Sequence, residues 1–230
     1  MRKQDGAWFG ALAALVAAAY ALFRRRLTFA AALGLGAVGL GVASRRWSRN
    51  SRGPFPYSLR WILAMPHPIS PELLRRGVQP DAGNHILEIG PGTGRHAVQV
   101  AQWIAPTGTL DVFDIQQDML DAVMHRGFDQ GLSNIIPSRG QAGDQLPYPD
   151  GRFDAAYLVT VFGEIPDPDI ALRELRRVLR RGGRLAVGEV LLDPDYTSLR
   201  ELRSLAESRG FRFVRRYGSP FAYVAQFDAV

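Results

Sequence analysis

The sequence predicts an α/β domain built on a doubly wound, mostly parallel sheet with an antiparallel hairpin at its C-terminal edge, preceded by two hydrophobic helices. From residue 85 onward, short apolar runs alternate with stretches whose apolar residues recur at helical spacing. Strands that alternate with helices form a parallel sheet with helices on both faces. The last two apolar runs are joined by only a short Gly-Ser-Pro turn, which favours an antiparallel pair.

The expected elements follow from this alternation. Ser70 and Pro71 begin a short helix as N-cap and first helical residue, Gly77 ends it, and Gly182-Gly183 ends a later one. The expected helices are 57–65, 71–77, 96–104, 117–127, 170–180 and 198–208. The expected strands are 85–89, 109–113, 134–137, 155–160, 184–190, 211–216 and 221–227.

A glycine-rich turn joins the first of these strands to the helix that follows it. Gly90, Gly92 and Gly94 recur at every second position, and glycine allows both a sharp turn and the close approach of a ligand to the main chain. The acidic Glu88 lies in the strand just before the turn. The turn is therefore suited to a cationic or hydroxylated ligand rather than to a phosphate.

The basic residues are concentrated at the N-terminus. Residues 1–60 hold ten basic residues and one acid, for a net charge of +9, whereas the remainder holds 18 basic and 21 acidic residues, for a net charge of −3. The body of the chain therefore has no positive excess suited to nucleic acid, and no such partner is expected. The chain has no cysteine, and its four histidines show no metal-ligand spacing, so neither disulfides nor a metal site are expected.

The first 44 residues are predicted to form a transmembrane or re-entrant helical hairpin. Residues 6–23 and 27–44 are uncharged, and each run is close to the lower length limit for crossing a bilayer. A cleaved signal peptide is the alternative for the first run. The basic linker at 45–56 favours the cytoplasmic side by the positive-inside rule, although three arginines between the runs would then lie on the far side.

Four features occur in order from residue 88 onward, and together they carry a family resemblance. Residues 57–230 resemble the class I S-adenosylmethionine-dependent methyltransferases, in the type 11-like branch that includes quinone-biosynthesis enzymes, and the resemblance implies a Rossmann-like fold. The four features are Glu88-x-Gly90-x-Gly92-x-Gly94, Asp114 at the end of the second strand, Leu146-Pro147-Tyr148-x-Asp150-x-x-Phe153-Asp154, and Arg177-Val178-Leu179-Arg180-x-Gly182-Gly183-x-Leu185.

The resemblance implies S-adenosyl-L-methionine as cofactor and assigns residues to it. The glycine-rich turn would pass under the methionine part, and Glu88 would receive its ammonium group. Asp114 would accept both ribose hydroxyls, since a carboxylate accepts two hydrogen bonds at once. Ile115 and Met119 would pack near the adenine, although ordinary core contact explains them equally well.

The chain departs from the family pattern where the adenine amino group is held. The family has an aspartate there, in Gly-Asp-Ala, and two alignments place either Ala142 or Gln141 at that position. The amide oxygen of Gln141 can accept from an amino group, and Asp144 is the nearest acid. Gln141 and Asp144 are therefore both candidates for adenine binding.

The glycine-rich turn taken alone also admits a dinucleotide-binding dehydrogenase. Counted from Gly92, the third position of the looser dinucleotide fingerprint is Ala97. The Phe153-Asp154 and Arg177–Gly183 segments, however, are not part of the dehydrogenase pattern. A methyltransferase is therefore the preferred interpretation.

The acceptor side has weaker candidates. Glu164 follows the fourth expected strand of the Rossmann-like sheet, at the edge where such folds bind ligands, and is the first candidate for an acid that faces the acceptor. His67 and Tyr196 come after it. Each also has an ordinary structural explanation, such as a helix cap, a surface carboxylate or a loop histidine.

The sequence thus predicts a cell-membrane methyltransferase whose catalytic domain, 57–230, lies on the cytoplasmic side and acts on a small, lipophilic acceptor. The membrane partner is expected to contact residues 6–44. A membrane-tethered protein that binds the cofactor without turnover is the alternative, because the adenine-side aspartate is missing.

Overall fold

The computed structural model describes residues 53–61, 63 and 67–230, which belong to a compact unit that extends over Ser48–Val230. The two expected hydrophobic helices at 6–44 lie outside the described residues, as do residues 45–52 of the expected basic linker. Within the part of the chain that is described, no helix has the length and apolar character needed to cross a membrane.

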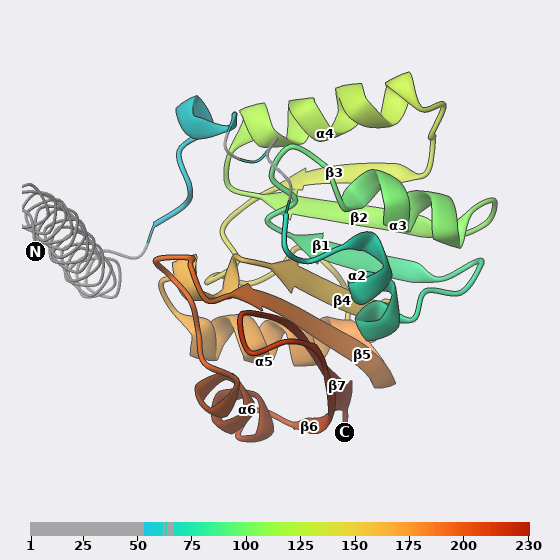
Figure 1. The fold of residues 1–230 in the computed structure, drawn as a ribbon. Helices are drawn as coiled ribbons and strands as arrows, with labels where there is room; N and C mark the ends of the chain where they lie inside the picture. Colours follow the sequence, from blue (N-terminus) through green and yellow to red (C-terminus); the bar gives the residue numbers. More distant parts are fainter. Residues whose placement is uncertain (1–52, 62, 64–66) are drawn as a thin grey trace, which may run out of the picture. The chain divides into compact units, whose positions relative to one another are not determined.

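A seven-stranded sheet forms the centre of the domain, in the order β3-β2-β1-β4-β5-β7-β6 (Figure 1). The first five strands in this order are mutually parallel, while β7 is antiparallel to both β5 and β6. The predicted mostly parallel sheet with an antiparallel C-terminal hairpin is therefore confirmed. The strands are β1 (His85–Ile89), β2 (Thr109–Asp114), β3 (Ile135–Arg139), β4 (Phe153–Val159), β5 (Leu179–Val190), β6 (Phe211–Gly218) and β7 (Ala222–Ala229).

Helices cover both faces of this sheet, with α2, α3 and α4 on one face and α5 and α6 on the other (Figure 1). Each layer buries its own apolar cluster, with Leu74 and Leu120 in one and Leu172 and Leu202 in the other. The described helices are α2 (Pro71–Val78), α3 (Ala97–Ile104), α4 (Gln117–Asp129), α5 (Pro168–Val178) and α6 (Leu199–Glu207), with the 3-10 turns η1 (Tyr57–Leu59) and η3 (Phe162–Glu164).

The glycine pair Gly182-Gly183 was predicted to end a helix, and this prediction is wrong. Helix α5 stops at Val178, and Leu179 is already extended and pairs with Phe153 of β4. The register then shifts, so that the residues up to Gly183 form a bulge inside β5. The buried Leu179 draws the chain into the sheet early, and Gly182, with a φ of 71°, accommodates the bulge.

Gly77 does not end helix α2 either. The helix continues to Val78 and ends at Gln79, whose left-handed φ of 48° lets its N–H donate to the Arg75 carbonyl. Gly77 is instead a close-packing residue, since a Cβ there would lie 2.4 Å from Cγ1 of Val224 in β7. The predicted start is confirmed, because the Ser70 hydroxyl accepts from the Leu73 N–H at 3.2 Å.

The segment expected as a helix over 57–65 begins with the 3-10 turn η1, and residues 62 and 64–66 lie outside the described part. Apart from this segment and the start of β5, the predicted element boundaries differ from the observed ones by at most two residues.

Candidate active site

The glycine-rich turn lies at the point of the sheet where the strand order reverses. Strand β1 has β2 on one side and β4 on the other, and all three are parallel, so their carboxyl ends meet at one edge. In open α/β sheets, ligands bind outside this edge at such a switch point. The residues that follow β1, β2, β4 and β5 are therefore the candidates for a site.

Three left-handed glycines shape the turn, with φ of 67° at Gly90, 54° at Gly92 and 81° at Gly94. A Cβ on Gly90 would lie 2.5 Å from Val161, and one on Gly94 would lie 3.0 Å from the Val123 backbone. Packing alone therefore requires glycine at these two positions. At Gly92 the nearest atom is the Leu63 Cδ1 at 3.2 Å, so Gly92 is the glycine most open to a ligand.

Glu88 is a buried carboxyl group at the base of this turn. Its side chain is 3% exposed, and its Oε2 has no hydrogen-bond partner within the described residues. Burial raises the pKa of Glu88 to about 8, with Asp114 adding to the rise and Tyr157, its neighbour in β4, opposing it. A buried carboxyl oxygen without a partner fits a site that receives a cationic group from a ligand.

Asp114 ends β2 on the other side of the turn. It is 8% exposed, and its Oδ1 accepts from the Gln116 N–H at 2.8 Å. Burial raises the pKa of Asp114, although the backbone hydrogen bonds from Gln116 and Ile115 oppose this. Its second oxygen can accept from ligand hydroxyls. Ile115 follows Asp114 and is 37% exposed.

The loop after β3 starts beside Asp114. The Gly140 N–H donates to the Asp114 carbonyl at 3.0 Å, and the Asp144 N–H donates to the Gln141 carbonyl at 3.0 Å. Gln141 is half-buried in this turn, whereas Asp144 is exposed. Of the two candidates for adenine binding, Gln141 is the more buried, and it directly follows Gly140, which is hydrogen-bonded to Asp114.

Glu164 lies in η3, after β4, where it meets other carboxyl groups. Its Oε2 accepts from the Phe55 N–H at 3.2 Å. Burial raises the pKa of Glu164 to about 8, and Asp193, Asp195 and Asp114 add to the rise. The sequence analysis placed Glu164 at this edge, and the structure also brings it into electrostatic contact with Asp114.

Glu189, near the end of β5, is a buried acid that the sequence analysis missed. It is 1% exposed; its Oε2 accepts from the Thr197 N–H at 3.0 Å, and its Oε1 has no partner within the described residues. Burial raises the pKa of Glu189 to about 8, with Glu164 among the acids that add to it. Its signal in the sequence is a lone charge inside the apolar run Leu185–Val190.

Residues 55–57 cross the edge of the sheet between the ends of β4 and β2. The Phe55 N–H donates to Glu164, and the Phe55 carbonyl accepts from the Gln116 Nε2 at 2.8 Å. The Tyr57 N–H donates to the Gln116 Oε1 at 3.2 Å. Further along, the Leu63 carbonyl accepts from Arg95 at 3.1 Å. We call residues 55–61 and 63 the strap; its Leu63 lies next to Gly92, just after the end of β1.

Residues 87–187, which include the glycine-rich turn and Asp114, match the family described as "Methyltransferase domain". Over these residues the chain is similar to a methyltransferase domain. Curated relatives include the ubiquinone/menaquinone biosynthesis C-methyltransferases UbiE of Pseudomonas putida and Hahella chejuensis. Each is 35% identical over 108 residues, or 47% of this chain. The matched part spans only 42% and 43% of those relatives.

The fold of the chain also matches solved structures. A SAM-dependent methyltransferase from Aquifex aeolicus aligns with a TM-score of 0.70 at 21% identity, covering 76% of this chain and 100% of that one. This likeness shows that the folds are similar. The family match favours a methyltransferase over a dinucleotide-binding dehydrogenase.

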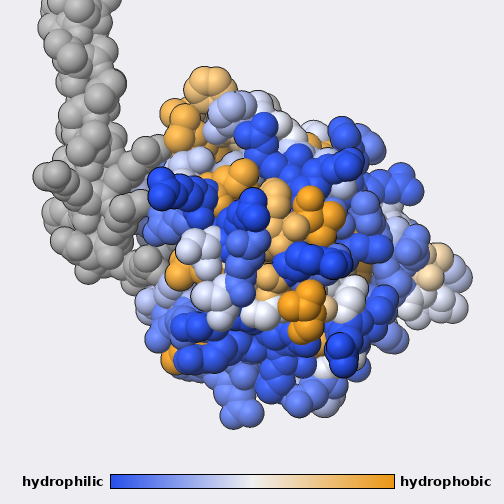
Figure 2. Space-filling view, turned by 90° about the horizontal axis from the view of Figure 1, so that it is seen from below, coloured by the Kyte–Doolittle hydropathy of each residue, from blue (hydrophilic) through white to orange (hydrophobic). Residues whose placement is uncertain are grey.

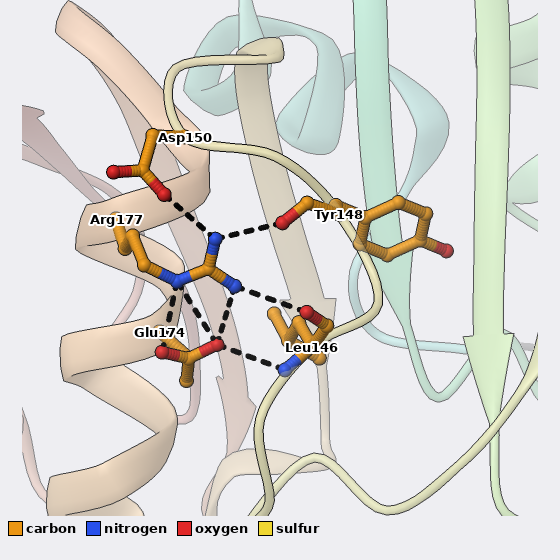
Figure 3. Close-up of polar contacts among 5 residues, drawn as sticks. All are labelled: Leu146, Tyr148, Asp150, Glu174 and Arg177. Atoms are coloured by element: carbon orange, nitrogen blue, oxygen red, sulfur yellow. Dashed lines mark hydrogen bonds and ion pairs between the residues drawn. The ribbon is translucent and has the colours of Figure 1, made fainter.

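Arg177 of α5 joins the two downstream sequence motifs, Leu146–Asp154 and Arg177–Leu185 (Figure 3). Its Nη1 donates to the Tyr148 carbonyl at 2.7 Å and to Asp150 at 2.9 Å, and its Nη2 donates to the Leu146 carbonyl at 3.0 Å. Glu174 accepts from Arg177 at 2.6 Å and from the Leu146 N–H at 2.8 Å. This network fixes the chain where the loop that carries Gln141 ends.

His67 interacts with residues on the α2–α3 side of the sheet. Its Nδ1 accepts from the Ile69 N–H at 3.1 Å, and its ring lies 5.6 Å from that of His96. Burial lowers the pKa of His67, and it lowers that of His96 to about 4. Both imidazoles are therefore neutral at pH 7. These contacts give His67 a structural role, and its predicted part in catalysis stays a prediction.

Proposed function

We propose that this chain is an S-adenosylmethionine-dependent methyltransferase that acts on a small, lipophilic acceptor, is held at the cell membrane by residues 6–44, and has its catalytic domain on the cytoplasmic side. The observation that carries the cofactor assignment is the pair of buried acids, Glu88 and Asp114, on either side of the glycine-rich turn. The names of the UbiE relatives support a quinone-type acceptor, and the two uncharged runs support the membrane location.

The residues of the site fit the parts of this cofactor. Glu88 would pair with the ammonium group of the cofactor, which would give its buried carboxylate a cationic partner. The open Gly92 would let the main chain lie against the methionine part. Asp114 would accept from the ribose hydroxyls through the oxygen that Gln116 does not hold. Ile115 would cover the adenine, and the Gln141 amide would accept from its amino group.

Glu164 is proposed as the acid on the acceptor side. S-adenosyl-L-methionine supplies a methyl group that is already activated, so the protein mainly aligns the acceptor for an in-line displacement. A base is needed only where the acceptor must lose a proton. With a pKa of about 8, the Glu164 carboxylate is a stronger base than an ordinary glutamate, and it lies at the carboxyl edge beside β4.

Incubating the purified full chain with membrane extract and methyl-labelled cofactor tests this proposal. We expect label in the lipid fraction, and its loss in Asp114→Asn but not in Asp118→Asn, which changes an exposed acid of α4. Cofactor binding in calorimetry without transfer to any extract component would favour the binding protein without turnover. Absence of cofactor binding would contradict the proposal as a whole.

A further inference from the structure

Two large apolar side chains stand exposed on adjoining loops of the domain. Leu192, in the loop after β5, is 89% exposed, and Phe221, just before β7, is 69% exposed. The Leu191 N–H donates to the Phe221 carbonyl at 2.8 Å, which holds the two loops together. The arrangement is therefore a built pair of loop tips rather than two unrelated surface residues.

These loop tips lie at the same edge of the sheet as the site. Val190 at the end of β5 pairs with Ala222 at the start of β7, so both loops project from the carboxyl edge. Glu189 immediately precedes this point and interacts electrostatically with Glu164. The exposed apolar pair thus flanks the acceptor side of the site.

The acidic neighbour of Leu192 faces its own loop. The Asp193 Oδ1 accepts from the Asp195 N–H at 2.8 Å, and the Asp193 N–H donates to the Val190 carbonyl at 2.9 Å. Its carboxylate is therefore engaged within the turn, and this leaves Leu192 as the group that projects outward.

The chain also reaches this edge from its N-terminal side. The Phe55 N–H donates a hydrogen bond to Glu164. Ten residues, 45–54, separate Phe55 from the uncharged run at 27–44. Ten extended residues span at most about 35 Å. The strap itself exposes Trp61 (62%) and Leu59 (40%), and tryptophan is favoured at a membrane–water interface.

A further view shows the domain from below the view of Figure 1. Figure 2 shows a mostly hydrophilic face on which apolar residues occur in small groups among charged ones.

Another exposed aromatic, Phe128, is 82% exposed near the end of α4. Because α4 leaves the end of β2 and its last turn leads to the start of β3, Phe128 lies at the opposite edge of the sheet and provides a matched control.

We propose that Leu192 and Phe221 form a membrane-contact surface that rests on a lipid bilayer, so that the carboxyl edge of the sheet faces the membrane. The inference rests on the proposed membrane location of the chain. It adds that the catalytic domain itself contacts lipid, beyond the N-terminal runs. A lipophilic acceptor would then reach the Glu164 side of the site directly from the bilayer.

The absence of cysteine in the natural chain makes a direct test simple. Single variants of the full chain, Leu192→Cys, Phe221→Cys and Phe128→Cys, are labelled with an environment-sensitive fluorophore and placed in liposomes that contain an anionic lipid. Brominated lipids then quench any label that enters the acyl region. We expect blue-shifted, strongly quenched emission at positions 192 and 221, and unquenched emission at 128.

Quenching at 192 and 221 that is no greater than at 128 would overturn the proposal. A blue shift at both positions without quenching by lipid would also overturn it, because a protein surface would then cover the loops. Cofactor binding by the same labelled proteins shows that they are folded. The same measurement separates this inference from the proposed function. If the natural chain does not bind the cofactor, the proposed function is contradicted, whereas the membrane contact of Leu192 and Phe221 is still decided by the quenching.

Discussion

Replacing Arg177 by methionine should lower the free energy of unfolding by more than the loss of an exposed ion pair in α5 would. The change keeps an unbranched, apolar side-chain stem but leaves Glu174, which is 15% exposed, without its cation. It also removes donors from the carbonyls of Leu146 and Tyr148. Hydrogen bonds to charged groups contribute about 1.5–3 kcal/mol each, and removing one partner exposes the cost of leaving the other buried.

The magnitude follows from which of these contacts are shielded from water. The partner Asp150 is 82% exposed, so its ion pair contributes about 0–1 kcal/mol. The contacts with Glu174 and the two carbonyls are the shielded ones, and we expect a total loss of about 3 kcal/mol. For a domain of this size, that corresponds to a fall of about 6–12 °C in the melting temperature.

Thermal unfolding of the full chain, followed by circular dichroism, measures this loss. The matched control is Arg173→Met, also in α5, whose pair with Asp169 is largely exposed (58% and 32%) and should cost at most about 1 kcal/mol. The pKa of Glu174 is lowered chiefly by its hydrogen bond to Arg177. Its contribution is therefore present above the unfolded pKa and lost as pH falls through the folded pKa.

Equal destabilisation by Arg177→Met and Arg173→Met at pH 7 would refute the argument. So would a difference between the two variants that stays constant down to pH 3, because protonation of Glu174 should remove part of it.

Three further predictions concern the site. Gly92→Ala should weaken cofactor binding at least about tenfold in calorimetry (about 1.4 kcal/mol), whereas Gly131→Ala, at a similar φ of 68° with nothing within 4 Å, should only cost stability; equal affinities would contradict a ligand at Gly92. Without cofactor, stability should fall as pH rises from 4.5 through about 8, because burial raises the pKa of Glu88, and Glu88→Gln should flatten this fall in pH-dependent melting curves. Glu164→Gln should lower kcat with little change in KM and remove the limb of the rate profile near pH 8; an unchanged profile would exclude Glu164 as the base.

Most of the sheet could be predicted because its signals are local. A strand buried on both faces is a continuous apolar run, and a helix that packs on it repeats its apolar residues every third or fourth position. Such patterns involve neighbouring residues only, and the boundaries derived from them agree to within two residues for most elements. The glycine-rich turn was found in the same way, whereas Asp114 was singled out by the family resemblance.

Glycines were misread where their role depends on a distant neighbour. Gly77 resembles a helix terminator, but it is required by the approach of Val224 in β7. Gly182-Gly183 likewise serves a bulge whose partner strand is β4. Local propensity cannot distinguish a glycine that ends a helix from one that admits another chain segment.

The sequence alone predicted the fold class, and the family resemblance that it carries singled out the glycine-rich turn and the two acids as candidates for cofactor binding. The arrangement of the acceptor side required the assembled chain. Phe55 meets Glu164 across 109 residues of sequence, and Glu189 acquires a raised pKa only because folding buries it near other acids. Burial and the charges around a group depend on contacts between distant segments, and no spacing of neighbouring residues records them.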